Sequence, residues 1–287
     1  MKSLENKMKD EKSVIKWMDK SFIQREKDST KGENGVIGVV GGSKNYISTP
    51  SIVGIGALRS GADLVKIVSN VKSVEVACNH KKGFLTSRID KYDGNIQEIV
   101  EEISGCTSMV IGNGTTKNPE TIETLLEVLK SSDLPVVIDA DMLTTRLKDL
   151  DFEGRKVVLT PHVKEFERLY EEVEGDLAAI KEKVKKAARV YQSTIVLKGE
   201  KDVISDGKTV FVNETGCPYL SKGGTGDLLA GVLARFLSET NGLKSSCLAT
   251  YLIGKSGEKA FDDIGPGFSL EELGKKVSIV LKEDFDL

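Results

Sequence analysis

Six short, almost uninterrupted runs of aliphatic residues recur along the chain, and they constrain its fold more than any other feature. Longer stretches with helically spaced apolar residues lie between them. Strands buried on both faces of a parallel sheet have this composition, and alternating strands and helices predict a doubly wound α/β sheet. The predicted strands are residues 35–40, 63–68, 108–112, 135–139, 156–160 and 194–198.

The helices predicted between and after these strands complete a single domain over residues 32–287. Two further short strands flank the Asp206-Gly207 pair, which predicts a hairpin within residues 202–216. Residues 1–31 are rich in Lys and Glu and predict a helical flank that docks on this domain. The predicted helices are residues 51–60, 95–103, 119–130, 164–171, 175–191, 227–238, 243–261 and 270–282.

The balance of charges and the cysteines narrow the class of protein. The 41 Lys and Arg residues against 44 Asp and Glu give a net charge of −3, which argues against a nucleic-acid partner. The sequence contains no run of about 18 apolar residues, so it predicts no membrane span. The N-terminus has no apolar segment typical of a signal peptide. The four cysteines are scattered, with no CxxC pair. We therefore expect a cytoplasmic protein in a reducing compartment.

The strongest local signal is the glycine-rich segment KGGTGD at residues 222–227, which precedes a long apolar helix. Backbone N–H groups at a helix start bind anions, and glycines let a phosphate approach the backbone. Asp227 lies at or near the N-cap of that helix and could be a simple cap. An acid beside a bound phosphate also suits a base that deprotonates a hydroxyl about to attack phosphorus. We predict that Asp227 is this catalytic base.

Four more polar residues stand at the ends of predicted strands, where α/β proteins bind their ligands. His162 follows Thr160-Pro161 and is either a ligand contact or a surface histidine. Asp139 and Asp141 could reach Mg²⁺, directly or through water, although Asp141 could instead cap a helix. Lys198 could meet a nucleotide phosphate or remain solvated.

Taken in order along the chain, these segments resemble the ribokinase-like superfamily and, within it, the NAD(P)H-hydrate dehydratases. GGTGD followed by LLAGVLARFL resembles the anion-hole motif of the superfamily. The other matching segments are KG at 31–32, GVIGVVGGS at 35–43, GALRSGA at 56–62, IGNG at 111–114, IDADML at 138–143, LTPH at 159–162 with Glu165, and LKG at 197–199.

The resemblance implies a three-layer α/β/α ribokinase-like domain with a mostly parallel central sheet, and an enzyme that dehydrates hydrated NADH and NADPH. ADP, or ATP in some relatives, would phosphorylate the hydrate hydroxyl, and loss of phosphate would restore the reduced nicotinamide. Mg²⁺ would accompany the nucleotide. The resemblance also implies a homo-oligomer, often a tetramer in relatives. We expect the epimerase that many relatives carry as a fused domain to be a separate chain.

The resemblance also assigns site residues. Asp227 would be both catalytic and substrate-binding, and no direct metal ligand is assigned beyond Asp139 and Asp141 through water. The remaining substrate contacts would be Gly56, Gly114 and His162. The nucleotide contacts would be Lys198, Gly199, Glu200, Lys201, Asp202, Gly224, Thr225 and Gly226.

The chain departs from the usual family pattern at GNGTT (112–116), PHVKE (161–165) and YLIGKSG (251–257), and in the residues that follow LKG. Two alternatives therefore stay open. One is a small-molecule kinase of the same fold, acting on a sugar or vitamin precursor, because it would share the anion hole and the base. The other is a nucleotide sensor without catalysis. The sequence separates neither ADP from ATP nor hydrated NADH from hydrated NADPH.

Overall fold

The computed structural model describes residues 24–287 except 81–82, 90 and 286. Within them, nine strands form one sheet in the order β3-β2-β1-β4-β5-β6-β7-β8-β9. Strands β1 to β7 run parallel, and β8 and β9 are antiparallel additions at one edge. The bounds are β1 Val36–Val40, β2 Leu64–Ser69, β3 Phe84–Arg88, β4 Ser108–Ile111, β5 Val136–Ile138, β6 Val157–Leu159, β7 Thr194–Leu197, β8 Asp202–Ser205 and β9 Val210–Asn213.

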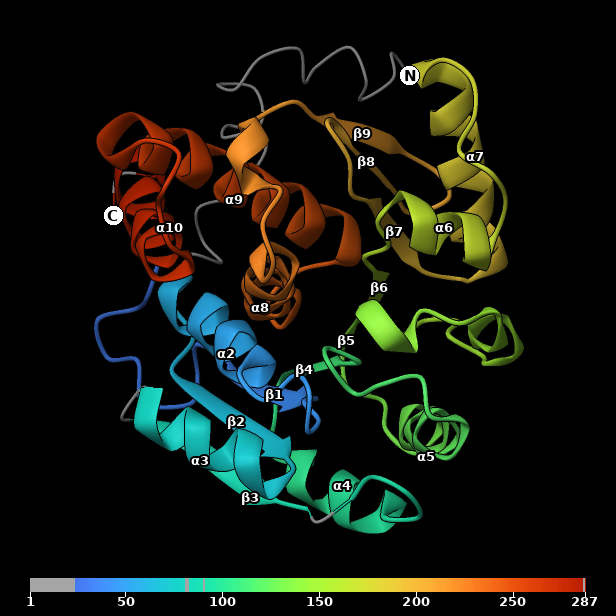
Figure 1. The fold of residues 1–287 in the computed structure, drawn as a ribbon, viewed down its shortest axis with the longest axis vertical. Helices are drawn as coiled ribbons and strands as arrows, with labels where there is room; N and C mark the ends of the chain where they lie inside the picture. The colour runs from blue at the N-terminus through green and yellow to red at the C-terminus, as the bar shows by residue number, and fades with distance from the viewer. Residues whose placement is uncertain (1–23, 81–82, 90, 286) are drawn as a thin grey trace.

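Helices cover both faces of this sheet and give a three-layer α/β/α domain (Figure 1). Helices α2, α8, α9 and α10 lie on one face, and α4, α5, α6 and α7 lie on the other. Helix α3 packs against β2 and β3, next to α2. The bounds are α2 Thr49–Arg59, α3 Val71–His80, α4 Ile96–Ile103, α5 Pro119–Lys130, α6 Val163–Leu169, α7 Leu177–Val190, α8 Thr225–Leu237, α9 Gly242–Ile264 and α10 Leu270–Phe285.

The central strands supply alternate residues to two separate apolar cores. Val137 and Val158 belong to the core under α8, α9 and α10, whereas Val136 and Ile138 belong to the core under α4 to α7. Since successive strand residues point to opposite faces, a strand covered on both sides must be apolar at every position. This confirms the six strands predicted from aliphatic runs. The predicted hairpin is also confirmed as β8 and β9, with Gly207 at φ 83° in its turn.

Two glycines let helices α2 and α8 touch through their backbones. A Cβ at Gly231 of α8 would lie 1.9 Å from the carbonyl oxygen of Val53, and a Cβ at Gly56 of α2 would lie 2.2 Å from that of Leu228. No side chain fits at either distance. The close contact holds α8 against α2.

The remaining differences from the sequence predictions concern the ends of the domain. The edge strand β3 and helix α3 were not predicted, because β3 is half-exposed and lacks an aliphatic run. The predicted helical flank falls mostly on residues 1–23, which lie outside the described residues, and residues 24–31 form turns. None of the helices that the structure describes is long and apolar enough to cross a membrane.

Candidate active site

The carboxyl ends of β4, β5 and β7 meet the start of α8 and bring four polar side chains into contact. Asn113 follows β4, Asp139 follows β5, Lys198 follows β7, and Asp227 lies in the first turn of α8. The Nδ2 of Asn113 donates to Asp227 Oδ1 at 2.7 Å and to Asp139 Oδ2 at 2.9 Å. Lys198 Nζ donates to Asp139 Oδ1 at 2.9 Å. One connected network therefore links the predicted base to two other strand ends.

Helix α8 begins two residues earlier than predicted, so Asp227 is its third residue and not its cap. The N-cap is Gly224, at φ 94°, a left-handed conformation that glycine adopts readily. The first N–H groups of a helix have no acceptor within the helix. In α8, the backbone N–H groups of Gly226 and Asp227 also have no acceptor elsewhere among the described residues. The hydroxyl of Thr225 is also buried without a partner. Unpaired donors at a helix start can bind an anion, and here they lie beside Asp227.

The ammonium of Lys198 lies next to this anion-binding turn. A Cβ built on Gly226 would be 3.4 Å from Lys198 Nζ, so glycine at this position leaves room for the cation. Burial disfavours the charged lysine, but the charge and hydrogen bond of Asp139, together with the charges of Glu165 and Asp227, outweigh it and raise the pKa of Lys198 above its ordinary value. Lys198 therefore stays cationic, with its partner Asp139 almost fully buried (4% exposed).

The pKa of Asp227 rises to about 7, chiefly because the carboxyl group is buried. The hydrogen bond from Asn113 lowers this pKa, the charge of Asp139 raises it, and the charge of Lys198 lowers it. A carboxyl group with a pKa near neutrality can accept a proton from a substrate and release it again at physiological pH. Perturbed carboxyl groups of this kind are typical of catalytic sites.

Asn113 is the member of the network that sequence reasoning missed. Its side chain is 1% exposed, and its Oδ1 is buried without a hydrogen-bond partner in the structure. In the segment GNGTT (112–116), the family resemblance assigns a contact only to Gly114. The signal in the sequence is a polar residue at the carboxyl end of a predicted strand, which is also where Asp139 and Lys198 lie.

The three predicted substrate contacts occupy different settings. His162 is the N-cap of α6, and its side chain is half exposed. Its backbone forms a β-bridge with that of Lys198, so His162 lies beside the network. Gly114 is at φ 73°, and a Cβ there would lie 2.7 Å from the Cβ of Tyr46. Gly56 is buried in the contact between α2 and α8 and is not brought to the polar network.

The predicted nucleotide segment after Lys198 turns away from the network. The N–H of Gly199 donates to Asp202 Oδ1 at 3.2 Å and closes a tight turn into β8. Glu200 and Lys201 between them are exposed, and Lys201 pairs with Glu214. Burial raises the pKa of Asp202 even though Asn213 donates to its carboxylate. The structure thus places Glu200 and Lys201 at the solvent side of this edge.

The two aspartates considered for a metal are already engaged by protein donors. Asp139 accepts from Lys198 and Asn113, and Asp141 Oδ2 accepts from the N–H of Thr116 at 3.0 Å. Across the described part of the chain, no group of three or more His, Cys, Asp or Glu side chains could hold a metal ion.

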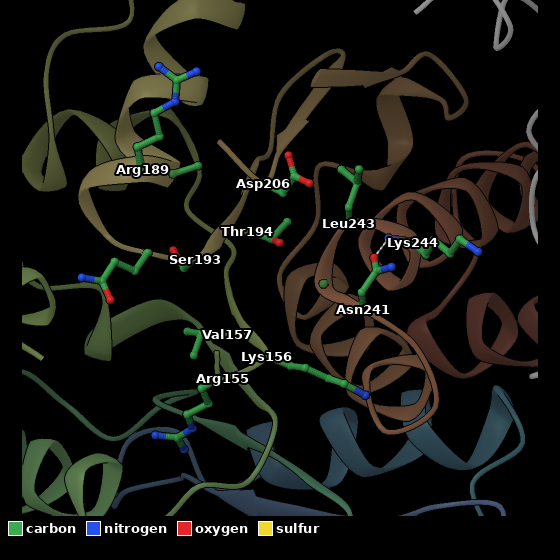
Figure 2. A pocket seen from close by; sticks show the side chains of 13 residues that line it. Arg155, Lys156, Val157, Arg189, Ser193, Thr194, Asp206, Asn241, Leu243 and Lys244 are labelled. Carbon is green, nitrogen blue, oxygen red and sulfur yellow. Dashed lines mark hydrogen bonds between the residues drawn. The ribbon is translucent and has the colours of Figure 1, made fainter. Parts of the chain in front are cut away.

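A separate hollow of about 380 Å³ lies at the opposite, amino edge of the sheet, where β6, β7 and α9 begin. Figure 2 shows that the charged ends of Arg155, Arg189 and Lys244 point away from it. These three charged groups therefore do not converge in the hollow. The chemistry of the domain is concentrated at the carboxyl edge, as expected for ligand sites in open α/β sheets.

Comparison with known proteins identifies the family. The family model described as NAD(P)H-hydrate dehydratase matches residues 37–278. The chain belongs to the NAD(P)H-hydrate dehydratase family. It is 32% identical over 265 residues to the ADP-dependent (S)-NAD(P)H-hydrate dehydratase of Cenarchaeum symbiosum, a match covering 90% of this chain and 92% of that protein.

A bifunctional relative in the same family is longer. The chain is 33% identical over 259 residues to the bifunctional NAD(P)H-hydrate repair enzyme of Archaeoglobus fulgidus, a match covering 88% of this chain and 52% of that protein. The chain thus spans about half the length of the bifunctional dehydratases it matches.

Solved structures agree with both the family and the fold. The ADP/ATP-dependent NAD(P)H-hydrate dehydratase of Bacillus subtilis, co-crystallised with ATP and Mg²⁺, aligns with a TM-score of 0.81 at 25% identity, over 93% of this chain and 98% of that one. A ribokinase-like superfamily protein of Enterococcus faecalis aligns with a TM-score of 0.80 at 22% identity, over 93% of this chain and 95% of that one. The predicted ribokinase-like fold and dehydratase family are confirmed, and the predicted activity is the one for which the family is named.

Proposed function

We propose that this chain dehydrates hydrated NADH or NADPH and uses ADP to activate the hydroxyl that leaves. The observation that carries the proposal is the position of Asp227. Its partly buried carboxyl group lies in the same helical turn as the unpaired amides of Gly226 and Asp227. A base and an anion site therefore adjoin, as phosphoryl transfer to a hydroxyl requires.

In the first step, the hydrate hydroxyl would lose its proton to Asp227 as its oxygen attacks the terminal phosphorus of ADP. The bond between that phosphorus and the bridging oxygen breaks, and AMP leaves. Asn113 occupies Oδ1 of Asp227, which leaves Oδ2 to take the proton. The amides of the α8 turn and the Lys198 ammonium would stabilise the charge on the transferred phosphoryl group.

In the second step, the bond between the ring carbon and the phosphorylated oxygen would break and release inorganic phosphate. Loss of a ring proton restores the double bond of the reduced nicotinamide. The balance is hydrated NAD(P)H plus ADP giving NAD(P)H, AMP and phosphate. We assign His162 and Gly114 to positioning the nicotinamide half, because both lie at the same carboxyl edge as Asp227.

Mg²⁺ is proposed as a companion of the nucleotide phosphates. The described residues offer no three-carboxylate cage, and this suits an ion that keeps most of its water and takes phosphate oxygens as ligands. Asp139 and Asp141 would contact such an ion through water. When bound, it would neutralise charge on the phosphates.

The test is the absorbance of reduced nicotinamide after mixing purified chain, Mg²⁺ and hydrated NADH, with no nucleotide, with ADP or with ATP. We expect a rise that depends on ADP, together with release of phosphate. A rise with ATP alone would keep the reaction and change the donor. A stable phosphate ester without phosphate release would instead indicate the kinase alternative, and nucleotide binding without turnover would indicate the sensor.

The variant Asp227→Ala tests the role of the proposed base in the same assay. It should lower turnover by orders of magnitude in folded protein. Near-normal turnover of that variant would contradict the role assigned to Asp227.

A further inference from the structure

A hollow of about 450 Å³ opens at the carboxyl edge of the sheet, next to the Asp227 network. Its walls come from the segments that follow β1, β2, β3 and β4, and from the first residues of helices α3 and α5. No step of the proposed reaction uses this hollow.

Three lysines surround the opening: Lys44 after β1, Lys72 at the start of α3 and Lys91 after β3. All three are exposed, and the structure shows no salt bridge or hydrogen bond from their side-chain ammonium groups to any residue that it describes. Asp93, a carboxylate in the wall, already accepts a hydrogen bond from Thr121 at 2.8 Å. The described charges around the hollow are thus mainly positive and favour a ligand that bears negative charge.

The interior of the hollow offers further contacts for such a ligand. The hydroxyl of Ser43 is buried without a hydrogen-bond partner in the described structure. Helices α3 and α5 both begin at the wall, so their N-terminal ends add to the positive potential. Val71, which is partly exposed, and Ile89 and Tyr92, which are 1% and 6% exposed, give the hollow an apolar lining.

The turn at residues 112–116 connects this hollow with the reaction centre. Asn113 reaches Asp227 from one side of the turn, while Thr115 and Thr116 line the hollow on the other. Gly114 lies between them. Gly114 is buried beneath the exposed Tyr46. A ligand with one end at Asp227 could therefore cross this turn along Tyr46 and place its other end among the lysines.

We propose that this lysine hollow binds the phosphate-bearing adenylate half of the hydrated dinucleotide while the nicotinamide half lies at Asp227. The proposal rests on the proposed dehydratase function. Hydrated NADPH carries an additional phosphate on its adenosine ribose, so its binding depends on the three lysines more strongly than that of hydrated NADH.

The test compares substrates with and without the adenylate half. Steady-state kinetics are measured with hydrated NADPH, hydrated NADH and the hydrate of reduced nicotinamide mononucleotide, for the wild type and for the combined Lys44→Gln, Lys72→Gln and Lys91→Gln variant. The KM for hydrated NADPH should rise by about tenfold or more, with kcat little changed. The KM for hydrated NADH should rise less, and kcat/KM for the mononucleotide hydrate should not change.

A matched control is Lys186→Gln, which removes an exposed lysine of α7, at the other end of the sheet (Figure 1). It should leave all three KM values unchanged. Calorimetric titration with 2′-phospho-ADP-ribose, which has the adenylate half and lacks nicotinamide, should show the same weakening in the triple variant and none in the control.

Three outcomes would overturn the proposal. The KM for hydrated NADPH could stay unchanged in the triple variant, the mononucleotide hydrate could be affected equally, or the KM for ADP could rise instead. Absence of turnover in the wild type would contradict the proposed function. In that case, the titration with 2′-phospho-ADP-ribose would still decide whether the lysine hollow binds an adenylate.

Discussion

Replacing Asn113 with alanine removes the amide that donates to Asp227 at 2.7 Å and to Asp139 at 2.9 Å. The carboxylate of Asp227 then loses a hydrogen bond that favours its ionised form. Because this bond lowers the pKa of Asp227, its removal should raise that pKa above about 7. The expected result is a base that is mostly protonated at neutral pH.

The size of the shift follows from the strength of the lost bond. A hydrogen bond to a charged group contributes about 1.5–3 kcal/mol, and one pKa unit corresponds to about 1.4 kcal/mol. The pKa of Asp227 should therefore rise by roughly 1 to 2 units. The ionised fraction at pH 7, and with it kcat, would fall roughly 5- to 50-fold and recover as the pH rises toward about 9.5.

The assay is the pH dependence of kcat for Asn113→Ala and the wild type. Ser108→Ala is the matched control, because Ser108 Oγ donates to the carbonyl oxygen of Ala234 and joins the same strand β4 to the same helix α8 at the opposite edge. This variant loses a buried hydrogen bond between the two elements without touching the carboxylates. Its pH profile should keep the position of the wild type.

Two results would refute the reasoning. An equal loss of kcat at every pH would mean that Asn113 acts on something other than the ionisation of Asp227. A shifted profile in Ser108→Ala would mean that any loosening between β4 and α8 perturbs the base. Thermal unfolding of both variants shows whether their losses of stability are comparable.

Three further outcomes follow from the same geometry. Asp227 has a folded pKa of about 7, above its unfolded value, so stability falls as pH rises from about 4 to about 7 and then levels off. Asp227→Asn should abolish turnover yet raise the free energy of unfolding at pH 8 by up to about 4 kcal/mol, with little gain at pH 4. Lys198→Gln leaves the buried Asp139 without its cation and should lower the free energy of unfolding in urea by about 3–5 kcal/mol, whereas adding Asp139→Asn should restore part of that loss. Gly231→Ala places a Cβ 1.9 Å from a carbonyl oxygen of α2 and should lower the free energy of unfolding in urea by about 3 kcal/mol. The control Gly105→Ala adds a Cβ that meets nothing within 4 Å, and its free energy of unfolding should stay within about 0.5 kcal/mol of the wild type.

Local chemistry was sufficient to predict much of this protein. A strand covered on both faces must be apolar throughout, so the aliphatic runs predicted the central strands and the layered α/β fold. A phosphate site at a helix start needs glycines, so residues 222–227 predicted where α8 begins to within two residues. These features depend on residues adjacent in the chain, and a sequence records them directly.

The tertiary structure decided which distant residues share a site. Asn113 and Asp227 are 114 positions apart, and they meet because β4 lies between β1 and β5 while α8 is held on α2. The near-neutral pKa of Asp227 likewise follows from its burial and its neighbours, not from its own segment. The packing of Gly56 of α2 against the backbone of α8 is likewise a long-range contact. Strand order, helix contacts and burial are long-range properties, and the spacing of residues in one chain does not contain them.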